Sequence, residues 1–377
     1  MSQNLFRKLK TFGFGSERGI PSLDGLRAVS ISLVLFAHLL GTRGFIPYFY
    51  SPLGEFGVRV FFVISGYLIT SILLKELKRE GSISLKRFYF RRSMRLFPAA
   101  YAFIAIIALL ASLHFLQLDH RDLKFALTYT ANFNNDRGWN LGHLWSLAVE
   151  EQFYLLWPFT LWMLGPARSG RFLFGVLAAA PLLRLASPFF DPAFNFVIWS
   201  DALATGCLLA LFRAELASHP IYARILRSRW FFLVPSAAVL ANYVPSTKLQ
   251  WLFCGTIMNV CIAASVDWAM RNPAGRCGRV LNYPAVAFLG VLSYSLYLWQ
   301  QPFLERASSS VLCSFPLNVV LALAAALLSY LCIECPFLRL RAALERAVPA
   351  RHDESQALGT APELGTTAQP LPSPTAD

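Results

Sequence analysis

The chain has 377 residues, of which 56% are hydrophobic and only 15% charged, and its formal net charge at pH 7 is +13. An average soluble domain has about 25% charged residues, so this composition argues against a soluble globular enzyme. It also excludes a disordered chain, which needs low hydrophobicity. Basic residues in so apolar a chain are typical of the cytoplasmic side of a membrane protein, which argues against a nucleic-acid partner.

The apolar residues form runs long enough to cross a lipid bilayer. A transmembrane helix needs roughly 20 mostly apolar residues. Windows of about this length cover 23–41, 56–74, 96–116, 142–164, 172–190, 194–212, 230–245, 250–269, 284–304 and 311–333. The sequence therefore predicts an all-α fold, a polytopic transmembrane helix bundle of about ten spans.

The distribution of Lys and Arg predicts the orientation of this bundle. If the N-terminus is cytoplasmic, 25 of the 34 basic residues fall on the cytoplasmic side and 6 on the far side, as the positive-inside rule requires. We therefore expect both termini in the cytoplasm. The predicted parts are a cytoplasmic N-terminal segment (1–20), a transmembrane domain (21–337) and a disordered cytoplasmic tail (338–377), which is rich in Pro, Thr and Ala.

The first span carries three ionisable side chains on one face. Arg27 and His38 are 11 positions apart, about three helical turns or roughly 16 Å, and Asp24 lies one turn before Arg27. The predicted orientation puts Arg27 near the cytoplasm and His38 in the outer half of the membrane. Ionisable groups within a span are costly and usually functional. The alternative is an Asp24–Arg27 ion pair beside a His38 that only hydrogen-bonds a neighbour.

The fourth span contains two adjacent carboxylates, Glu150 and Glu151. Glu150 shares a polar stripe with Ser146 and Tyr154, each about one turn away. Ser146 and Glu150 should lie at a depth similar to that of His38, and a carboxylate that orients a histidine is a common arrangement for a general base. The alternative is a hydrogen-bond network that only joins helices.

A basic cluster, Arg91, Arg92 and Arg95, precedes the third span at its cytoplasmic end. Arginine binds phosphate through paired hydrogen bonds, so the cluster is a candidate site for a phosphorylated ligand. The alternative is anchoring to anionic lipid. No metal site is predicted, because the C-x-x-C pair Cys332 and Cys335 lacks a second Cys or His pair.

Taken together, these segments resemble the bacterial integral-membrane acyltransferase type 3 family, over about residues 20–340. The family includes O-acetyltransferases that modify lipopolysaccharide O-antigens, exopolysaccharides and nodulation factors. The most specific element is the Arg-x10-His pair formed by Arg27 and His38. The other blocks are FFVISGY (61–67), FYFRRSMRLFP (88–98), LWSLAVEEQFY (144–154), SYSLYLW (293–299) and ECP (334–336).

The resemblance implies an enzyme in the bacterial inner membrane that transfers an acyl group, usually acetyl, from cytoplasmic acyl-CoA to a hydroxyl of a carbohydrate or lipid-linked sugar. We expect Arg92 and Arg95, with Arg91, to hold the CoA phosphates. His38 is then expected to act as general base or to take the acyl group itself.

Three further residues complete the expected site. Glu150 orients the imidazole of His38, Ser146 joins the network, and Arg27 neutralises Asp24 and lines the CoA channel.

One departure from the family is visible after the SYSLYLW block, where the family commonly has His and this chain has Gln300 and Gln301. Two alternative functions remain at this point. One is acylation of a small molecule such as a macrolide. The other is transport or flipping of a lipid-linked or anionic solute, against which stands the lack of an internal repeat of the transporter kind.

Overall fold

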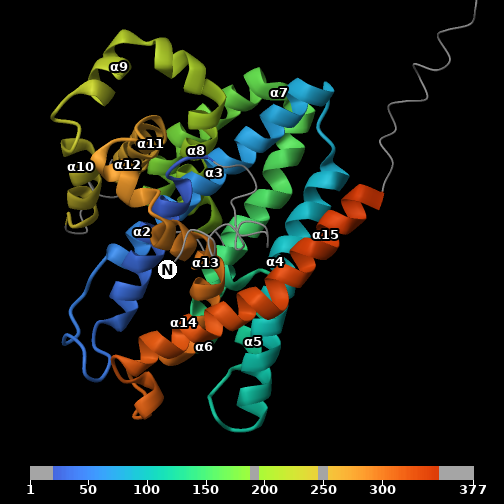
Figure 1. Cartoon of the computed structure of the whole chain (residues 1–377), viewed down its shortest axis with the longest axis vertical. Coiled ribbons are helices and arrows are strands. Elements are labelled where there is room, and N and C mark those ends of the chain that lie inside the picture. Colours follow the sequence, from blue (N-terminus) through green and yellow to red (C-terminus); the bar gives the residue numbers. More distant parts are fainter. Residues whose placement is uncertain (1–19, 187–194, 245–253, 348–377) are drawn as a thin grey trace, which may run out of the picture.

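The computed structural model describes residues 20–186, 195–244 and 254–347, and every regular element within them is helical (Figure 1). The predicted all-α fold is confirmed for these residues. The longer helices are α2 (Leu23–Leu39), α3 (Leu53–Glu80), α4 (Leu85–Ser112), α5 (His120–Leu127), α7 (Leu144–Ala186), α8 (Asn195–Ser218), α9 (Pro220–Arg227), α10 (Leu233–Asn242), α11 (Gly255–Arg271), α13 (Pro284–Trp299), α14 (Leu317–Ser329) and α15 (Cys335–Ala347). Two shorter helices are α6 (Trp139–Gly142) and α12 (Arg276–Leu281), and a π-helical turn, η7 (Tyr330–Glu334), joins α14 to α15.

Several helices differ in length from the apolar windows that predicted them. The fourth and fifth windows form one element, α7, which bends at Gly165, where φ is 72°. Helix α4 starts at Leu85, well before its window at 96–116, and Ser84 caps it by accepting a hydrogen bond from the Arg87 N–H at 3.4 Å. A hydropathy window misses these first turns because they are helical but highly charged.

Three helices among the described residues are long and apolar enough to cross a membrane: Leu53–Glu80, Leu85–Ser112 and Leu317–Arg346. The third consists of α14, η7 and α15 in succession. The predicted tail falls into two parts, because α15 continues to Ala347 while 348–377 lie outside the described residues. The expected N-terminal segment, 1–20, lies almost wholly outside them too. The count of ten spans and the cytoplasmic termini stay predictions.

Helices α2 and α13 lie side by side and run in the same direction. Gly290, near the middle of α13, meets the backbone of Asp24 in the first turn of α2 so closely that a Cβ on Gly290 would lie 1.7 Å from the Asp24 carbonyl oxygen. At their other ends the side chains of His38 and Gln300 are in hydrogen-bonding contact. Close backbone contact through small residues is typical of membrane helix pairs, and here it aligns α2 with the second half of α13.

Helix α8 packs against α3 through a similarly close contact, and these two helices also run in the same direction. A Cβ on Gly66 would lie 2.1 Å from the carbonyl oxygen of Leu203. Early in both helices Arg59 pairs with Asp201 at 3.9 Å, and later Arg213 donates to the Tyr67 hydroxyl at 3.0 Å.

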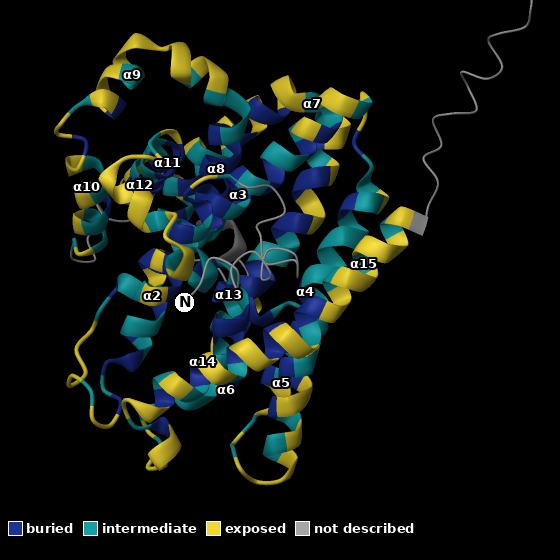
Figure 2. Cartoon of the chain, viewed as in Figure 1, coloured by how far each residue is buried: buried dark blue, intermediate teal, exposed yellow. Residues whose placement is uncertain are grey.

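Large apolar side chains remain exposed on the outward faces of several helices (Figure 2). On α7 Leu155 is 62% exposed and Leu182 65%, and on α14 Leu328 is 62% exposed. A soluble monomer rarely exposes contiguous apolar surface on this scale, so these faces fit contact with lipid.

Candidate active site

Helix α2 holds the predicted stripe of ionisable groups. Arg27 Nη1 lies 3.8 Å from Asp24 Oδ1, and both side chains are 17% exposed. His38 lies in the last turn of the same helix. The local ion pair predicted from the spacing is therefore present, and His38 sits at the opposite end of the helix from it.

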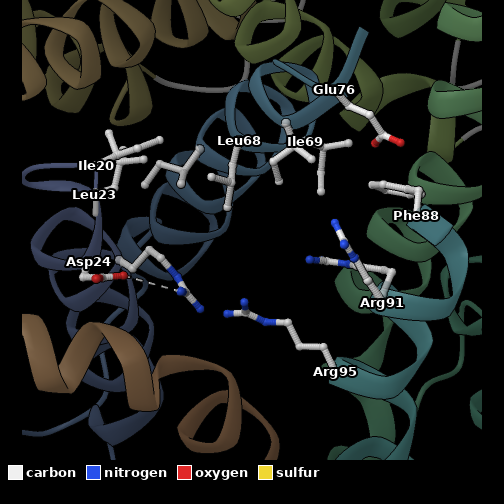
Figure 3. A pocket seen from close by; sticks show the side chains of 13 residues that line it. Ile20, Leu23, Asp24, Leu68, Ile69, Glu76, Phe88, Arg91 and Arg95 are labelled. Atoms are coloured by element: carbon white, nitrogen blue, oxygen red, sulfur yellow. Dashed lines mark ion pairs between the residues drawn. The ribbon is translucent and has the colours of Figure 1, made fainter. Parts of the chain in front are cut away.

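A cavity with an empty volume of about 820 Å³ lies between α2, α3 and α4. Its polar lining consists of Asp24, Arg27, Glu76, Arg91, Arg92 and Arg95. Figure 3 shows Arg91 and Arg95 pointing from α4 into this space, toward the side on which Asp24 lies. Four guanidinium groups against two carboxylates make the cavity suited to an anion with several phosphates.

The three arginines of α4 have different surroundings. Arg91 Nε donates to Glu345 of α15 at 2.7 Å. The guanidinium of Arg92 stacks 3.5 Å from the ring centre of Tyr154. Arg95 has no hydrogen bond or ion pair with any residue that the structure describes. Arg95 is thus the arginine best placed to bind a ligand without breaking an existing contact.

A second cavity continues from the first toward α7 and α13, and Arg27, Arg92 and Arg95 line both. The carboxylate of Glu150 lies here and accepts hydrogen bonds from the hydroxyls of Ser65 and Tyr154. Arg27, Arg92, Arg95, Ser146 and Glu150, predicted from separate segments of the sequence, therefore surround one space.

Two hydroxyls mark the far end of this second cavity. Ser146 Oγ lies 2.5 Å from the hydroxyl of Tyr297, and that hydroxyl also donates to the carbonyl oxygen of His143 at 2.8 Å. Tyr297 lines both the second cavity and a third one, of about 980 Å³, beyond it.

The third cavity contains His38. Its Nδ1 lies 2.9 Å from Gln300 Oε1, and its ring meets Trp139 at a centroid distance of 5.5 Å. Arg306 also lines this cavity, donates to the carbonyl oxygen of Ala37 at 2.8 Å and stacks 4.4 Å from the ring centre of Tyr48. Aromatic rings beside charged groups suit a polar ligand with apolar faces, such as a sugar.

The expected contact between Glu150 and His38 is absent from the hydrogen bonds of the described residues. Glu150 is held by Ser65 and Tyr154, and the imidazole is held by Gln300. Glu150 lines the second cavity together with Arg27, whereas His38 lines the third.

Some residues of the site were not assigned a role from sequence. Tyr297 was visible as part of a polar helix face, and Gln300 as a departure from the family. Trp139 and Arg306 gave no signal, because each lies outside every motif and reaches the site only through the fold.

Long apolar helices around a series of charged cavities are typical of a membrane protein with an internal polar site, and comparison with known families identifies its class. The family model described as the acyltransferase domain matches residues 20–335. The chain belongs to this family, which confirms the resemblance inferred from the motifs.

Curated relatives agree with this assignment. The chain is 29% identical over 320 residues to peptidoglycan O-acetyltransferase OatA of Listeria monocytogenes (strain EGD-e), covering 76% of this chain and 50% of OatA. It is 30% identical over 359 residues to YrhL of Bacillus subtilis (strain 168), provisionally named a peptidoglycan O-acetyltransferase, covering 85% of this chain and 55% of YrhL. The chain thus spans about half the length of these relatives. No solved structure matches it.

Proposed function

We propose that this protein is a membrane-embedded O-acyltransferase that transfers an acyl group, acetyl in the first instance, from cytoplasmic acyl-CoA to a hydroxyl of a cell-envelope carbohydrate. The observation that carries the proposal is the series of three adjoining cavities, which leads from the arginines of α4 past Glu150 and Tyr297 to His38. The names of the relatives make peptidoglycan the first acceptor to test.

The proposal places the protein in the bacterial inner membrane, with about ten spans and both termini in the cytoplasm. The directions of the helices support it. In a ten-span chain the first and ninth spans run in the same direction, and the corresponding helices α2 and α13 do so. The second and sixth spans also share a direction, and so do the corresponding helices α3 and α8. Helix α4 should run opposite to the fourth span, and its Tyr89 meets Leu155 while Phe103 meets His143, as an antiparallel pair requires.

The donor would enter from the cytoplasmic end of α4. Arg92 and Arg95 then bind the diphosphate of CoA, and Arg91 lies at the junction with an outer cavity between α3, α4 and α15. Lys75, Arg79 and Arg341 line that outer cavity and offer positive charge to the 3′-phosphate. The pantetheine arm would follow the second cavity toward His38.

In this arrangement Glu150 contributes to the binding of the acyl-CoA donor. It accepts a hydrogen bond from Tyr154, whose ring lies under the guanidinium of Arg92. We assign Glu150 a positioning role for Arg92, and we keep Arg27 as the neutraliser of Asp24 and a wall of the donor channel. Ser146 and Tyr297 supply hydroxyls along the path of the acyl group.

His38 would act as the general base. The acceptor hydroxyl gives its proton to the imidazole, its oxygen bonds to the thioester carbonyl carbon, and the C–S bond breaks. The CoA thiolate then takes the proton from the imidazolium, so the products are an O-acyl sugar and CoA thiol. The phosphates of CoA stay at the cytoplasmic end, because only the thioester has to reach His38.

The test is acyl transfer by the purified chain in lipid nanodiscs, with labelled acetyl-CoA and peptidoglycan fragments. We expect label on the glycan together with release of CoA thiol. Mass spectrometry of envelope glycans from cells with and without the gene should show the matching loss of an acetyl-sized mass. Flipping of a lipid-linked sugar by the same protein in sealed vesicles, without any acyl-CoA turnover, would instead favour a transporter and overturn the proposal.

A further inference from the structure

Gln300 contacts His38 directly from a well-fixed position. Its backbone N–H donates to the Leu296 carbonyl at 3.1 Å at the end of α13, and its own carbonyl accepts from Phe303 at 3.2 Å and Leu304 at 3.1 Å. The side chain is fully buried, and its Oε1 lies 2.9 Å from His38 Nδ1. An amide that is buried and anchored on both sides of its backbone has little freedom to turn away.

The chemistry of this contact determines which nitrogen of His38 can accept a proton. In this orientation of the amide its oxygen, which only accepts hydrogen bonds, faces Nδ1, so Nδ1 carries the hydrogen and the lone pair of the neutral ring is on Nε2. We infer that Gln300 is the positioning residue of His38, holding the imidazole as the Nδ1–H tautomer with Nε2 as the reactive nitrogen. This inference rests on the proposed function, in which His38 is the base.

The packing of α2 against α13 keeps the two side chains in register. The close approach of Gly290 to the Asp24 backbone fixes the middle of α13 against the first turn of α2, and the Gln300–His38 contact joins the C-terminal ends of the two helices. Trp139 packs its ring edgewise against the imidazole. The ring of His38 is therefore held by a hydrogen bond on Nδ1 and by an aromatic contact.

The partner is a neutral amide rather than a carboxylate. During transfer Nε2 takes the proton of the acceptor hydroxyl and later returns it to the CoA thiolate, and the Nδ1–H bond to Gln300 is kept throughout. A carboxylate in place of the amide would stabilise the imidazolium and hold the proton more firmly. The other titratable or charged groups around this cavity are Tyr48, Tyr50, Glu55, Arg137, His143, Tyr297 and Arg306.

The experiment measures kcat and its pH profile for the full chain in nanodiscs. Gln300→Leu keeps the volume but removes the acceptor, so we expect kcat to fall roughly 10- to 100-fold, the scale on which outer partners of a histidine act, with an unchanged KM for acetyl-CoA. Gln300→His, which restores an acceptor, should recover part of the loss. Gln300→Glu should move the acid limb of the profile up by about 1 to 3 pH units.

Asn318→Leu is the matched control. Asn318 is also a fully buried amide, but it bonds to the carbonyl of Cys313 and not to the site, so its loss should leave the pH profile unchanged. A folded Gln300→Leu protein with wild-type kcat and pH profile would overturn the inference. So would an acid limb in Gln300→Glu that stays where the wild type has it.

A second readout separates this inference from the proposed function. Solid-state ¹⁵N NMR of histidine-labelled protein, with His38 assigned by difference from His38→Ala, reports the tautomer without any substrate. Nδ1–H in the wild type and a mixture of tautomers in Gln300→Leu would support the inference even if acyl transfer were absent. Nε2–H in the wild type would overturn it even if the enzyme were active.

Discussion

The imidazole of His38 is the group on which the proposed transfer depends. Removing a general base typically costs about 10²- to 10⁴-fold in rate, so His38→Ala should lower acetyl transfer at least about 100-fold. The melting temperature should fall modestly, because the buried amide of Gln300 loses its partner, so transfer is compared at a temperature where both proteins are folded. His219, an exposed residue before α9, provides the control, and His219→Ala should be fully active. Wild-type transfer by His38→Ala would remove His38 from the mechanism.

Arg95 gives a test of donor binding. A hydrogen bond to a charged group is worth about 1.5–3 kcal/mol, so Arg95→Ala should raise the KM for acetyl-CoA by about tenfold or more and leave the KM for the acceptor nearly constant. Steady-state kinetics with each substrate varied in turn measures both constants. Arg121→Ala, a change at an exposed residue of α5, is the control. If the KM for the acceptor rose more than the KM for acetyl-CoA, the arginines of α4 would bind acceptor or lipid instead.

For single residues, the sequence predicts side-chain contacts within one helix and misses contacts between helices. Asp24 and Arg27 are three positions apart, and helix geometry alone brings them together. The contact of His38 with Gln300 spans 262 positions, and that of Glu150 with Ser65 spans 85. Such pairs depend on how helices pack, which periodicity in the sequence does not specify. The prediction that Glu150 orients His38 depends on such a pair, and among the described residues Glu150 is hydrogen-bonded to Ser65 and Tyr154 instead.

The close packing of helix α13 on helix α2 can be tested by substitution. A Cβ at position 290 would collide with the Asp24 backbone, and overpacking of this kind costs about 1–3 kcal/mol. Gly290→Ala should therefore lower the melting temperature in detergent and also the rate of transfer, because it shifts Gln300 relative to His38. A Cβ at Gly175 of α7 would meet nothing within 4 Å, so Gly175→Ala should do neither. Equal melting temperatures for both variants would contradict the close contact.

The role of helix α15 in donor binding can be tested in the same way. Arg341 lines the outer cavity that we assign to the 3′-phosphate of CoA, and a partly exposed ion pair is worth up to about 1 kcal/mol. Arg341→Ala should raise the KM for acetyl-CoA about fivefold and leave that for 3′-dephospho-acetyl-CoA unchanged. Arg346→Ala, an exposed change on the same helix, should alter neither. A similar rise for both donors would place the 3′-phosphate elsewhere.

The elements that hydropathy predicted poorly are the ones that line the proposed donor site. Helix α4 begins at Leu85, before its apolar window, and α15 continues to Ala347, beyond the window that predicted α14. Both extensions are charged, and Arg91 of one meets Glu345 of the other. A window that seeks bilayer-length apolar runs stops where such charges begin, so it finds the apolar parts of these helices and loses the charged ends that we propose bind the donor.

For the whole molecule, the arrangement of the helices relates the surplus of positive charge to the cavities. Most basic residues lie on the side predicted to be cytoplasmic, and the arginines of α4 lie at that same end of the cavity series. The fold class and the motif residues were predictable because they depend on composition and local spacing. The path between the cavities was not, since it exists only where α2, α3, α4, α7 and α13 meet.

The span formed by α13, which carries Gln300 at its end, provides the sharpest test of the topology. Helix α13 has 16 residues, about 24 Å of helix, against roughly 30 Å of hydrocarbon, yet the proposal requires the chain to cross the membrane between Cys277 and Ser309. With the other cysteines replaced by alanine, a membrane-impermeant maleimide should label Ser309→Cys in right-side-out vesicles. Cys277, which is exposed, should be labelled only in inside-out vesicles, as should Lys78→Cys at the end of α3. Labelling of Cys277 and Ser309→Cys from one side would mean that α13 does not cross, and His38 would then lie on the wrong side of the bilayer for an extracytoplasmic acceptor.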